Sequence, residues 1–482
     1  MMDDQIARLI RNFGWLALSE VGTRLIGLAI AIYLARILGA SLYGAVGLSI
    51  ALVSILEIVV RAGTGPRAMR QVALDPSSIP EVYSQIVGLR ITMGCALIII
   101  VYLAAPSLSV ALSIPTGLLV LYSFSLVGPA LTTAWAFRGL ERMHVVALGS
   151  TFRRLIVLLG FLCFVRDGAT DLLRIPVIEV IGTLCMVSWY WTRLRREHRP
   201  LSVRFSVTKW PAILREALPV SLSALLGLVY VHGDVLLLGW FSDSAMAGEF
   251  LVAHMIVLAF STLAEMLNKA AFPATSRLVT RDPSHGLRLH ADLCRCSLLV
   301  IVPLVTYGAF YSKVIIITLF GHDYAKAHAV LTLLLMTLPI VALNQSLRHL
   351  SLALARSSHL LIGVGLGASV HVALALVLIP KAGTAGAALA CLIGEAVSMI
   401  ALLVLVRIAA RGVPLQYRSF APFAAGGSLA MMLALTAPME PALGLLLSAT
   451  TYLIVVSLLK GIDRSDLQVI RRVILSLSNQ ER

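Results

Sequence analysis

The chain has few charged residues for its length. Only 13% of its 482 residues are Asp, Glu, Lys or Arg, whereas 59% are hydrophobic and the mean hydropathy is +0.92. A soluble domain carries about twice that share of charged side chains. The hydrophobic residues form successive runs of about 20, the length that crosses a bilayer as a helix. This composition excludes a soluble protein and predicts an all-α polytopic membrane protein.

Sites for metals, cofactors and nucleotides are also missing. Most of the six cysteines lie inside apolar runs, where cysteine is usually a small hydrophobe, and the close pair Cys294-x-Cys296 has no histidine or carboxylate cluster beside it. The sequence contains no GxxxxGK[ST] loop and no long outer segment that could hold a catalytic site. We therefore expect no metal, no cofactor and no enzymatic activity.

Turn residues divide the apolar sequence into fourteen predicted transmembrane helices. The predicted spans are 13–37, 43–62, 86–105, 116–137, 144–165, 172–192, 218–240, 246–270, 297–317, 327–347, 358–379, 383–406, 419–437 and 441–460. The polar stretch Met1–Arg11 is too short to be a signal peptide, and a full-length run follows it. We expect the first run to remain as a helix.

Lysine and arginine are distributed unevenly between the two sides of these spans. If the N-terminus and every second loop share one side, that side holds 32 of the 39 basic residues, and Arg90, Arg153 and Arg154 are counted there. Six lie on the other side, and Arg24 lies inside the first span. The positive-inside rule then places both termini in the cytoplasm. The net charge of +15 is an orientation signal, and we expect no nucleic-acid partner.

The stretch 57–77 is repeated at 265–284. The matched positions, 207 residues apart, are Pro66/Pro273, Arg70/Arg277, Val72/Val279 and the Asp-Pro-Ser turns 75–77 and 282–284. Repeats of this length in transporters relate two bundles, here by an axis along the membrane normal. The repeat therefore predicts two six-helix lobes with two further helices at the C-terminal end.

The domain boundaries follow from the spans and the repeat. We expect an N-lobe at 1–192 with spans one to six, and a basic cytoplasmic linker at 193–217. A C-lobe at 218–406 would hold spans seven to twelve, and 407–482 would hold the C-terminal helix pair and a cytoplasmic tail.

Ionisable residues deep inside a span indicate function, because each costs about 2.5–3.5 kcal/mol to insert. Arg24 lies near the middle of the first span, and Glu20 lies one turn earlier on the same face. Arg24 is our first candidate for a substrate-binding cavity. The alternative is a structural pair in which Glu20 and Arg24 satisfy each other.

Four further residues are candidates for the substrate-binding cavity. His232 and Asp234 occupy the level in span seven that the repeat matches to Arg24, and Glu179 and Glu395 lie within spans six and twelve. For Asp234 the alternative is a hydrogen bond between helices, and lone buried polar residues often serve packing.

Two charge pairs lie near the ends of spans two and eight. Glu57/Arg61 is echoed, one position out of phase, by Glu265/Lys269. We interpret these pairs as a candidate cytoplasmic gate or headgroup contact. The alternative is that their long basic side chains only extend to the membrane surface.

The sequence resembles a known transporter family. Ala35-Arg36-x-Leu38-Gly39-x-x-x-Tyr43-Gly44 resembles the common signature of bacterial oligosaccharide flippases, the O-antigen and exopolysaccharide translocases of the multidrug/oligosaccharidyl-lipid/polysaccharide exporter superfamily. Asp234-x-x-x-x-Gly239…Gly248-x-Phe250-x-x-Ala253 resembles the matching element of the second half, with Phe250 where the family usually has Tyr.

The resemblance implies two six-helix lobes and a function in the bacterial inner membrane. An undecaprenyl-diphosphate-linked oligosaccharide would cross from the inner to the outer leaflet by alternating access, for O-antigen, capsule or exopolysaccharide biosynthesis. Cationic residues, Arg24 above all, would hold the diphosphate, and spans thirteen and fourteen could offer a groove for the lipid. Proton or sodium coupling and polymerase and chain-length-control partners are expected.

Three other functions stay open at this point. The chain could be an ion-coupled drug or cation antiporter of the same superfamily, which would use acidic residues such as Asp234 and Glu395. It could be a lipid II flippase. A membrane enzyme such as a polysaccharide polymerase is disfavoured by the short outer loops.

Overall fold

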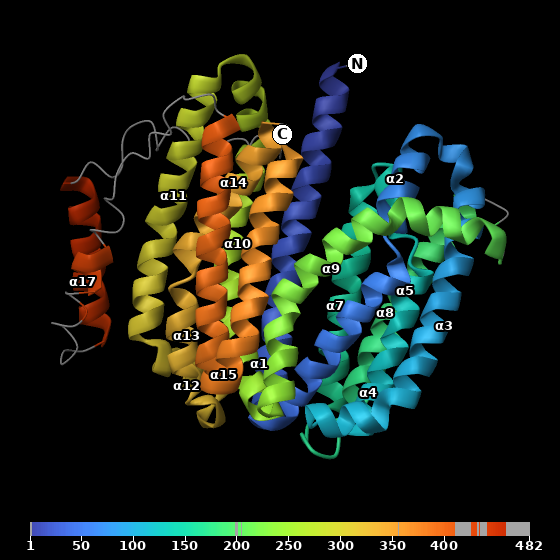
Figure 1. Ribbon diagram of the computed structural model, residues 1–482, viewed down its shortest axis with the longest axis horizontal. Helices are drawn as coiled ribbons and strands as arrows, with labels where there is room; N and C mark the ends of the chain where they lie inside the picture. The colour runs from blue at the N-terminus through green and yellow to red at the C-terminus, as the bar shows by residue number, and fades with distance from the viewer. Residues whose placement is uncertain are drawn as a thin grey trace. The chain divides into compact units, whose positions relative to one another are not determined.

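The computed structural model describes residues 2–197, 201–203, 205–354, 356–409, 426–430, 433 and 441–458, with the backbone alone for 2–21. All regular elements in this part of the chain are helices, as predicted. They are α1 (Met2–Arg61), α2 (Thr64–Leu74), η1 (Pro76–Ser78), α3 (Ile79–Leu112), α4 (Thr116–Ser123), η2 (Phe124–Leu126), α5 (Val127–Leu131), α6 (Ala134–Gly139), α7 (Met143–Phe164), α8 (Arg174–Glu197), η3 (Val207–Lys209), α9 (Trp210–Phe241), α10 (Ser244–Arg281), α11 (Pro283–Phe310), α12 (Ser312–Phe320), η4 (His322–Tyr324), α13 (Ala327–Leu335), α14 (Leu338–Ala353), α15 (Ser357–Ala409) and α17 (Pro441–Leu458) (Figure 1).

The helices agree with the predicted spans. Among the described residues, eight helices are long and apolar enough to cross a membrane, and the bent pair α13–α14 could form a ninth span. Two of the eight hold two predicted spans each, because α1 breaks at Gly39 and α15 breaks at Gly383. Most of the predicted span 419–437 lies outside the described residues.

Several helices are longer than the hydrophobic runs predicted, and α3 and α11 are examples. α3 continues through Pro106 to Leu112, and α11 begins at Pro283 although its apolar run was placed at 297–317. A helix ends where its backbone is capped, and that point can lie outside the hydrocarbon. Here Asp282 starts α11 by accepting a hydrogen bond from His285 N at 3.2 Å.

The sequence repeat has a structural counterpart. Asp75 (φ −144°, ψ 97°) and Asp282 (φ −141°, ψ 90°) have nearly the same extended backbone. Each carboxylate accepts a 2.7 Å hydrogen bond from the serine two residues later. Both aspartates start a helical turn, so the repeat marks equivalent helix beginnings in the two halves of the sequence.

The chain divides into two compact units, Met1–Leu251 and Val252–Arg482. In the first unit, α3 and α7 lie alongside α1, and α8 packs against α7 (Figure 1). Its core contains Trp135, Phe137 and Tyr190, and the Tyr190 hydroxyl donates to Val146 O at 3.0 Å. In the second unit, α11 and α14 pack on one another and α14 packs on α15. The division into the predicted lobes stays a prediction.

Two segments of the first unit make a reciprocal backbone contact. A Cβ atom on Gly44 would lie 2.8 Å from Gly248 N, and one on Gly248 would lie 3.1 Å from Gly44 N. The Cβ on Gly44 would overlap the carbonyl oxygen of Ser244, and the Cβ on Gly248 would overlap that of Ala40. The pairs Gly44/Gly248 and Ala40/Ser244 are each 204 positions apart in the sequence. Ser41 Oγ lies 3.2 Å from Ser244 Oγ beside this contact. The glycines of the sequence signature are therefore needed for close packing of backbone on backbone.

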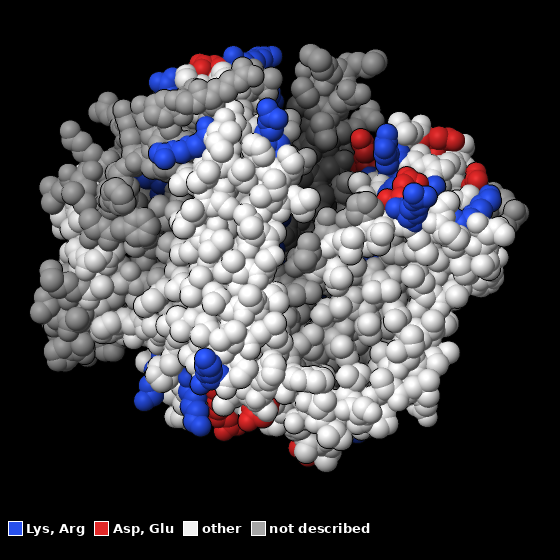
Figure 2. Space-filling view, in the orientation of Figure 1, with Lys and Arg blue, Asp and Glu red and all other residues white. Residues whose placement is uncertain are grey.

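The surface has the character expected of a membrane protein. On the face drawn in Figure 2, the charged side chains gather at the ends of the helices and leave an uncharged middle. In α3, Ile99, Tyr102 and Leu103 are each more than half exposed. Such an apolar surface suits lipid.

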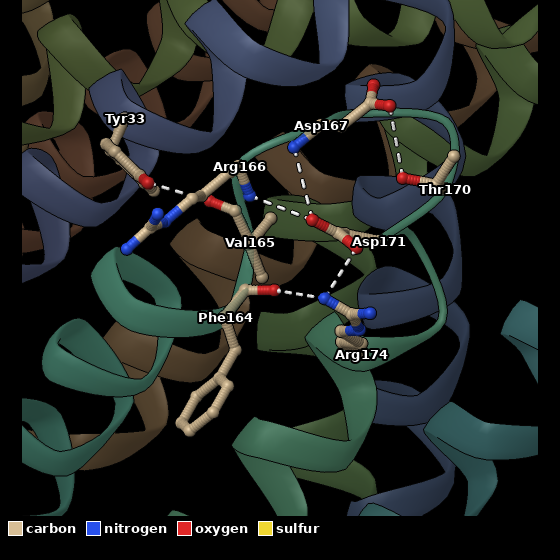
Figure 3. Close-up of polar contacts among 8 residues, drawn as sticks. All are labelled: Tyr33, Phe164, Val165, Arg166, Asp167, Thr170, Asp171 and Arg174. Atoms are coloured by element: carbon tan, nitrogen blue, oxygen red, sulfur yellow. Dashed lines mark hydrogen bonds and ion pairs between the residues drawn. The ribbon is translucent and has the colours of Figure 1, made fainter.

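A short loop connects α7 to α8 and packs against α1 (Figure 3). The Asp171 carboxylate accepts hydrogen bonds from Arg166 N at 3.0 Å and Asp167 N at 3.2 Å, and it pairs with Arg174 at 2.7 Å. The Tyr33 hydroxyl of α1 donates to Val165 O at 2.7 Å. The loop is therefore held both by its own carboxylate and by the first helix.

We expect Gly44→Val to destabilise the protein by about 3 kcal/mol, because the added side chain overlaps backbone atoms that cannot rotate away. Gly27→Ala is the matched control in the same helix, since no atom lies within 4 Å of its new Cβ. Thermal unfolding in detergent measures both variants. Equal stability of Gly44→Val and the wild type would contradict this account of the contact.

The loop predicts a pH dependence. The backbone N–H groups of Arg166 and Asp167 and the charge of Arg174 hold the Asp171 pKa below its ordinary value of 3.8. The stabilisation is present above that ordinary value and is lost as the pH falls through the lower folded pKa. Asp171→Asn should be less stable at pH 7, and the difference should shrink below pH of about 4.

Asp167→Asn serves as the control for this loop, because that carboxylate accepts only from the Thr170 hydroxyl in the figure, at 3.1 Å. Unfolding temperatures at several pH values between about 7 and 3.5 give the comparison. A constant difference between Asp171→Asn and wild type across this range would show that ionisation of Asp171 is not the cause.

Candidate functional site

The first unit contains an arginine-rich cavity of about 470 Å³. Eight helices, α1 to α8, contribute residues to its wall. Its charged lining residues are Glu57, Arg61, Arg90, Arg138, Arg153, Arg154 and Glu179. Five guanidinium groups against two carboxylates give the wall a net positive charge. We call this space the arginine cavity.

Each carboxylate of the arginine cavity is paired with one arginine. Arg61 Nη2 lies 2.8 Å from Glu57 Oε2 within α1. Arg153 Nη2 lies 2.6 Å from Glu179 Oε2, and Arg153 Nε donates to Thr183 Oγ1 at 3.0 Å. Within each pair the two charges cancel. The net positive charge of the cavity therefore comes from the other three arginines.

Arg90 is the most deeply buried of them, at 2% exposure. Its Nε and Nη2 donate to Thr64 Oγ1 at 3.0 and 2.8 Å, and its Nη1 lies 3.5 Å from Pro129 O. Among the described residues, no carboxylate is within ion-pair distance of Arg90. Burying a charge without a counter-ion is unfavourable by several kcal/mol. Such a group is retained where an anion completes the site.

Arg138 of α6 and Arg154 of α7 line the same cavity, and neither makes an ion pair with a described residue. Together with Arg90 they bring three unneutralised guanidinium groups from three helices to one space. Guanidinium groups present planar pairs of N–H donors that match phosphate or carboxylate oxygens. The arginine cavity is thus suited to an oxyanion of more than one charge.

The local sequence explains why Thr64 reaches Arg90. α1 ends at Arg61, and Ala62 (φ 47°) and Gly63 (φ 61°) take left-handed conformations before α2 begins. A Cβ on Gly63 would meet the backbone of Ala217. The break turns the chain inward, and the Thr64 hydroxyl, which donates to Arg61 O at 2.8 Å, still accepts from Arg90.

The predicted site residues fall in several places. Glu57, Arg61 and Glu179 line the arginine cavity. Arg24 lies on α1, half-buried and outside that lining, and the side chain of Glu20 is outside the described residues. Arg24 is hydrogen-bonded or charge-paired, so its role as a cavity residue stays a prediction.

His232 and Asp234 lie on α9 of the same unit, outside the arginine cavity, and Asp234 is 5% exposed. Each residue, through its side chain or its backbone, already takes part in an interaction such as a hydrogen bond, an ion pair or a ring contact. Their roles in substrate binding stay predictions.

The remaining predicted residues lie in the second unit. Lys269 pairs with Glu265 at 2.9 Å within α10, which reproduces the Glu57–Arg61 geometry. Glu395 is 4% exposed, and its side-chain and backbone oxygens accept from Asn344 Nδ2. Arg348 Nη2 lies 3.7 Å from the same carboxylate. These contacts join α14 to α15.

Sequence reasoning missed Arg90, Arg138, Arg153 and Arg154 because it counted them with the basic side of the membrane. A signal for two of them was present. Arg153 and Arg154 lie near the middle of the predicted span 144–165, at a depth similar to that of Arg24 in its own span. Arg90 lies close to one end of its predicted span, and its burial depends on tertiary contacts that the sequence does not show.

Comparisons with known proteins agree with this architecture. The family described as "Polysaccharide biosynthesis protein" matches residues 9–279. A curated relative, "Putative O-antigen transporter" of Shigella dysenteriae, is 26% identical over 266 residues, which cover 54% of this chain. The match spans 65% of that relative, just under two thirds of its length.

Solved structures share the fold at low sequence identity. The lipid II flippase MurJ in an inward closed conformation matches with a TM-score of 0.75 and 16% identity, covering 92% of this chain and 98% of that one. An inward-facing multidrug resistance MATE family transporter of the MOP superfamily matches with a TM-score of 0.65 and 14% identity, covering 85% and 99%. The chain is therefore a multi-pass membrane protein with a transporter fold.

Arg90→Met tests whether this arginine has a structural role. Met has a similar length and no charge, and Thr64 keeps its own hydrogen bond to Arg61 O. We expect the variant to be as stable as wild type or more stable by about 1–4 kcal/mol, because an uncompensated buried charge is removed.

Arg153→Met is the contrasting variant, since it leaves Glu179 without its partner and should destabilise by about 1–3 kcal/mol. Thermal unfolding in detergent compares the two variants. A loss of stability in Arg90→Met as large as that in Arg153→Met would indicate that Arg90 serves mainly to hold the fold.

Proposed function

Since this chain belongs to the polysaccharide biosynthesis protein family, which matches more than half of it, we propose that it is a flippase for a lipid-linked oligosaccharide. The substrate is an undecaprenyl-diphosphate-linked oligosaccharide, moved from the inner to the outer leaflet of the bacterial cytoplasmic membrane by alternating access. It serves O-antigen, capsule or exopolysaccharide biosynthesis. The fold shared with the lipid II flippase MurJ supports this proposal.

The observation that carries the proposal is the buried guanidinium of Arg90, which has no carboxylate partner among the described residues and lines the arginine cavity. A diphosphate diester carries two negative charges on adjacent phosphates. Arg90, Arg138 and Arg154 offer three positive charges from different directions. Burial of Arg90 strengthens its attraction for phosphate relative to the same contact in water, whereas Arg138 is exposed and gains less.

The physical problem of the reaction is to carry this charge across hydrocarbon about 30 Å thick. Fixed arginines replace the water that the diphosphate loses, so the headgroup does not have to enter lipid unaccompanied. Glu57 and Glu179 already occupy Arg61 and Arg153. Those two arginines can exchange a carboxylate for phosphate, which limits how tightly the substrate is held.

A drug or cation antiporter is less well supported. A cation entering the arginine cavity would meet five guanidinium groups, and both carboxylates are already paired. Like charges in a site of low dielectric exclude a ligand effectively. Lipid II fits the arginines as well as an oligosaccharide lipid does, because the two share the diphosphate, and transport measurements separate them.

The orientation and energy source belong to the same proposal. Both termini lie in the cytoplasm, as the distribution of Lys and Arg favours. A proton or sodium gradient drives transport, since the sequence has no phosphate-binding loop for ATP. A polymerase and a chain-length-control protein act on the substrate after it crosses.

Transport by the purified protein in liposomes tests the proposal. Arg90→Met should lower the rate of translocation of an undecaprenyl-diphosphate oligosaccharide by about 10- to 100-fold, since a charge-assisted contact to phosphate contributes about 1.5–3 kcal/mol. Arg90→Lys, which keeps the charge and loses the fork of donors, should lose less. Arg142→Met is the matched control, because Arg142 pairs with Glu197 outside the cavity.

Two further arms refine the result. Arg24→Ala should abolish surface polysaccharide in cells while the protein still reaches the membrane, if Arg24 also contacts the substrate. Lipid II in the same liposomes should move more slowly than the oligosaccharide lipid. Unchanged translocation in Arg90→Met, with the variant folded, would refute the role of the arginine cavity.

A further inference from the structure

A second cavity, of about 580 Å³, adjoins the arginine cavity within the first unit. The two cavities have part of their walls in common, including Glu57, Arg61, Arg90, Trp135 and Arg138. The remaining wall of the second cavity comes from α1, α2 and α9. We call it the α2–α9 cavity.

The two cavities differ in chemistry away from the shared arginines. The α2–α9 cavity is completed mainly by the apolar residues Ile58, Pro66, Met69 and Leu228. The arginine cavity adds the hydroxyl-bearing residues Tyr122, Ser125, Thr132, Ser150, Thr183 and Tyr190 and the charged Arg153, Arg154 and Glu179, beside apolar residues that include Ile50, Val53, Val146 and Met186. It is the more polar of the two cavities. The arginines therefore lie where a polar space meets an apolar one.

We propose that the α2–α9 cavity binds the first isoprene units of a prenyl diphosphate, with the diphosphate at the shared arginines and the sugar in the arginine cavity. This inference rests on the proposed function and adds the orientation of the substrate. It also assigns the lipid a binding site inside the first unit, formed by α1, α2 and α9.

The order of groups in the substrate matches the order of the walls. A prenyl diphosphate sugar has an apolar chain, a doubly charged centre and a polar sugar in sequence. The reverse orientation would place sugar hydroxyls against Ile58, Met69 and Leu228, where they would lose their hydrogen bonds to water without replacement. The proposed orientation buries the isoprene units against apolar side chains and leaves the sugar among hydroxyl groups.

The α2–α9 cavity also has an opening suited to a long chain. Met69 and Pro66, on the first turns of α2, are both exposed and both line it. α2 is held over the cavity by the left-handed Gly63, which packs against α9, and by an ion pair between Arg67 and Glu216 at 3.2 Å. A chain too long for the cavity can leave it beside Met69.

Binding measurements on the full-length protein in lipid nanodiscs test the proposal with two soluble probes. Inorganic pyrophosphate reports the arginines alone, and geranyl diphosphate adds two isoprene units. Wild type should bind geranyl diphosphate at least about tenfold more tightly than pyrophosphate, because the added carbons leave water. Leu228→Gln should remove most of this gain and leave pyrophosphate affinity within about twofold.

Met69→Gln is the second variant, because Met69 is exposed and the substitution leaves the buried core unchanged. It should also reduce the gain in affinity. Arg142→Met, outside both cavities, is the control that should leave the gain in affinity unchanged. The lipid assignment would be overturned if wild type bound geranyl diphosphate no more tightly than pyrophosphate. It would also be overturned if both glutamine variants kept the full gain in affinity. Displacement of geranyl diphosphate by an equal concentration of phosphatidylglycerol would overturn it in favour of a general acyl-chain site.

Arg90→Met separates this inference from the proposed function. If Arg90→Met binds neither pyrophosphate nor geranyl diphosphate, and wild type binds geranyl diphosphate more tightly than pyrophosphate, both the proposed function and the lipid site are supported. Binding of pyrophosphate that depends on Arg90, without any gain from the geranyl chain, refutes only the lipid site. Binding of both probes unaffected by Arg90→Met refutes the diphosphate site on which the inference rests.

Discussion

The proposed substrate site depends on the contact between Arg90 and Thr64, which holds a charged side chain in the interior of the first unit. A guanidinium at 2% exposure has its hydrogen bonds met by a hydroxyl and a carbonyl, but its charge is not neutralised by any described carboxylate. Hydrogen bonds satisfy the donors without cancelling the charge. The left-handed turn at Ala62 and Gly63 precedes α2 and brings that hydroxyl to Arg90, which lines both cavities. A fold that tolerates such a charge gives an anion a place to bind.

The two internal ion pairs have a different consequence. Arg61 and Arg153 are engaged by Glu57 and Glu179 at 2.8 and 2.6 Å, so the arginine cavity never presents five free cations at once. A transporter must release what it binds, and a site that is too attractive would retain a diphosphate. Carboxylates that compete for the same guanidinium groups reduce the net binding energy. The attraction of Arg90 for the diphosphate and the competition from the two carboxylates would therefore together set how tightly the substrate binds and how readily it is released.

Much of the fold could be predicted from the sequence, and the site only in part. Run lengths and turn residues located the spans, because these signals are local. The repeated Asp-Pro-Ser stretches were interpreted only as turns, and the structure shows that Asp75 and Asp282 stand at equivalent helix starts. The Glu57–Arg61 pair was predictable from its spacing of four on a helix. Arg90 was not, because its burial depends on Thr64 and Pro129, which are distant in sequence. Counting basic residues by side treats every arginine as a surface charge.

The sequence signature and the proposed substrate site lie in different parts of the first unit. The signature that carries the family resemblance contains Gly44, and its requirement is steric, since the backbone of Ser244 and Gly248 leaves no room for a Cβ. That requirement is the same whatever substrate is carried. The arginines that line the cavities come from α1, α3, α6 and α7 and share no short motif. A motif search can therefore identify the scaffold, whereas the chemistry of the substrate has to be argued from side chains that only the folded chain brings together.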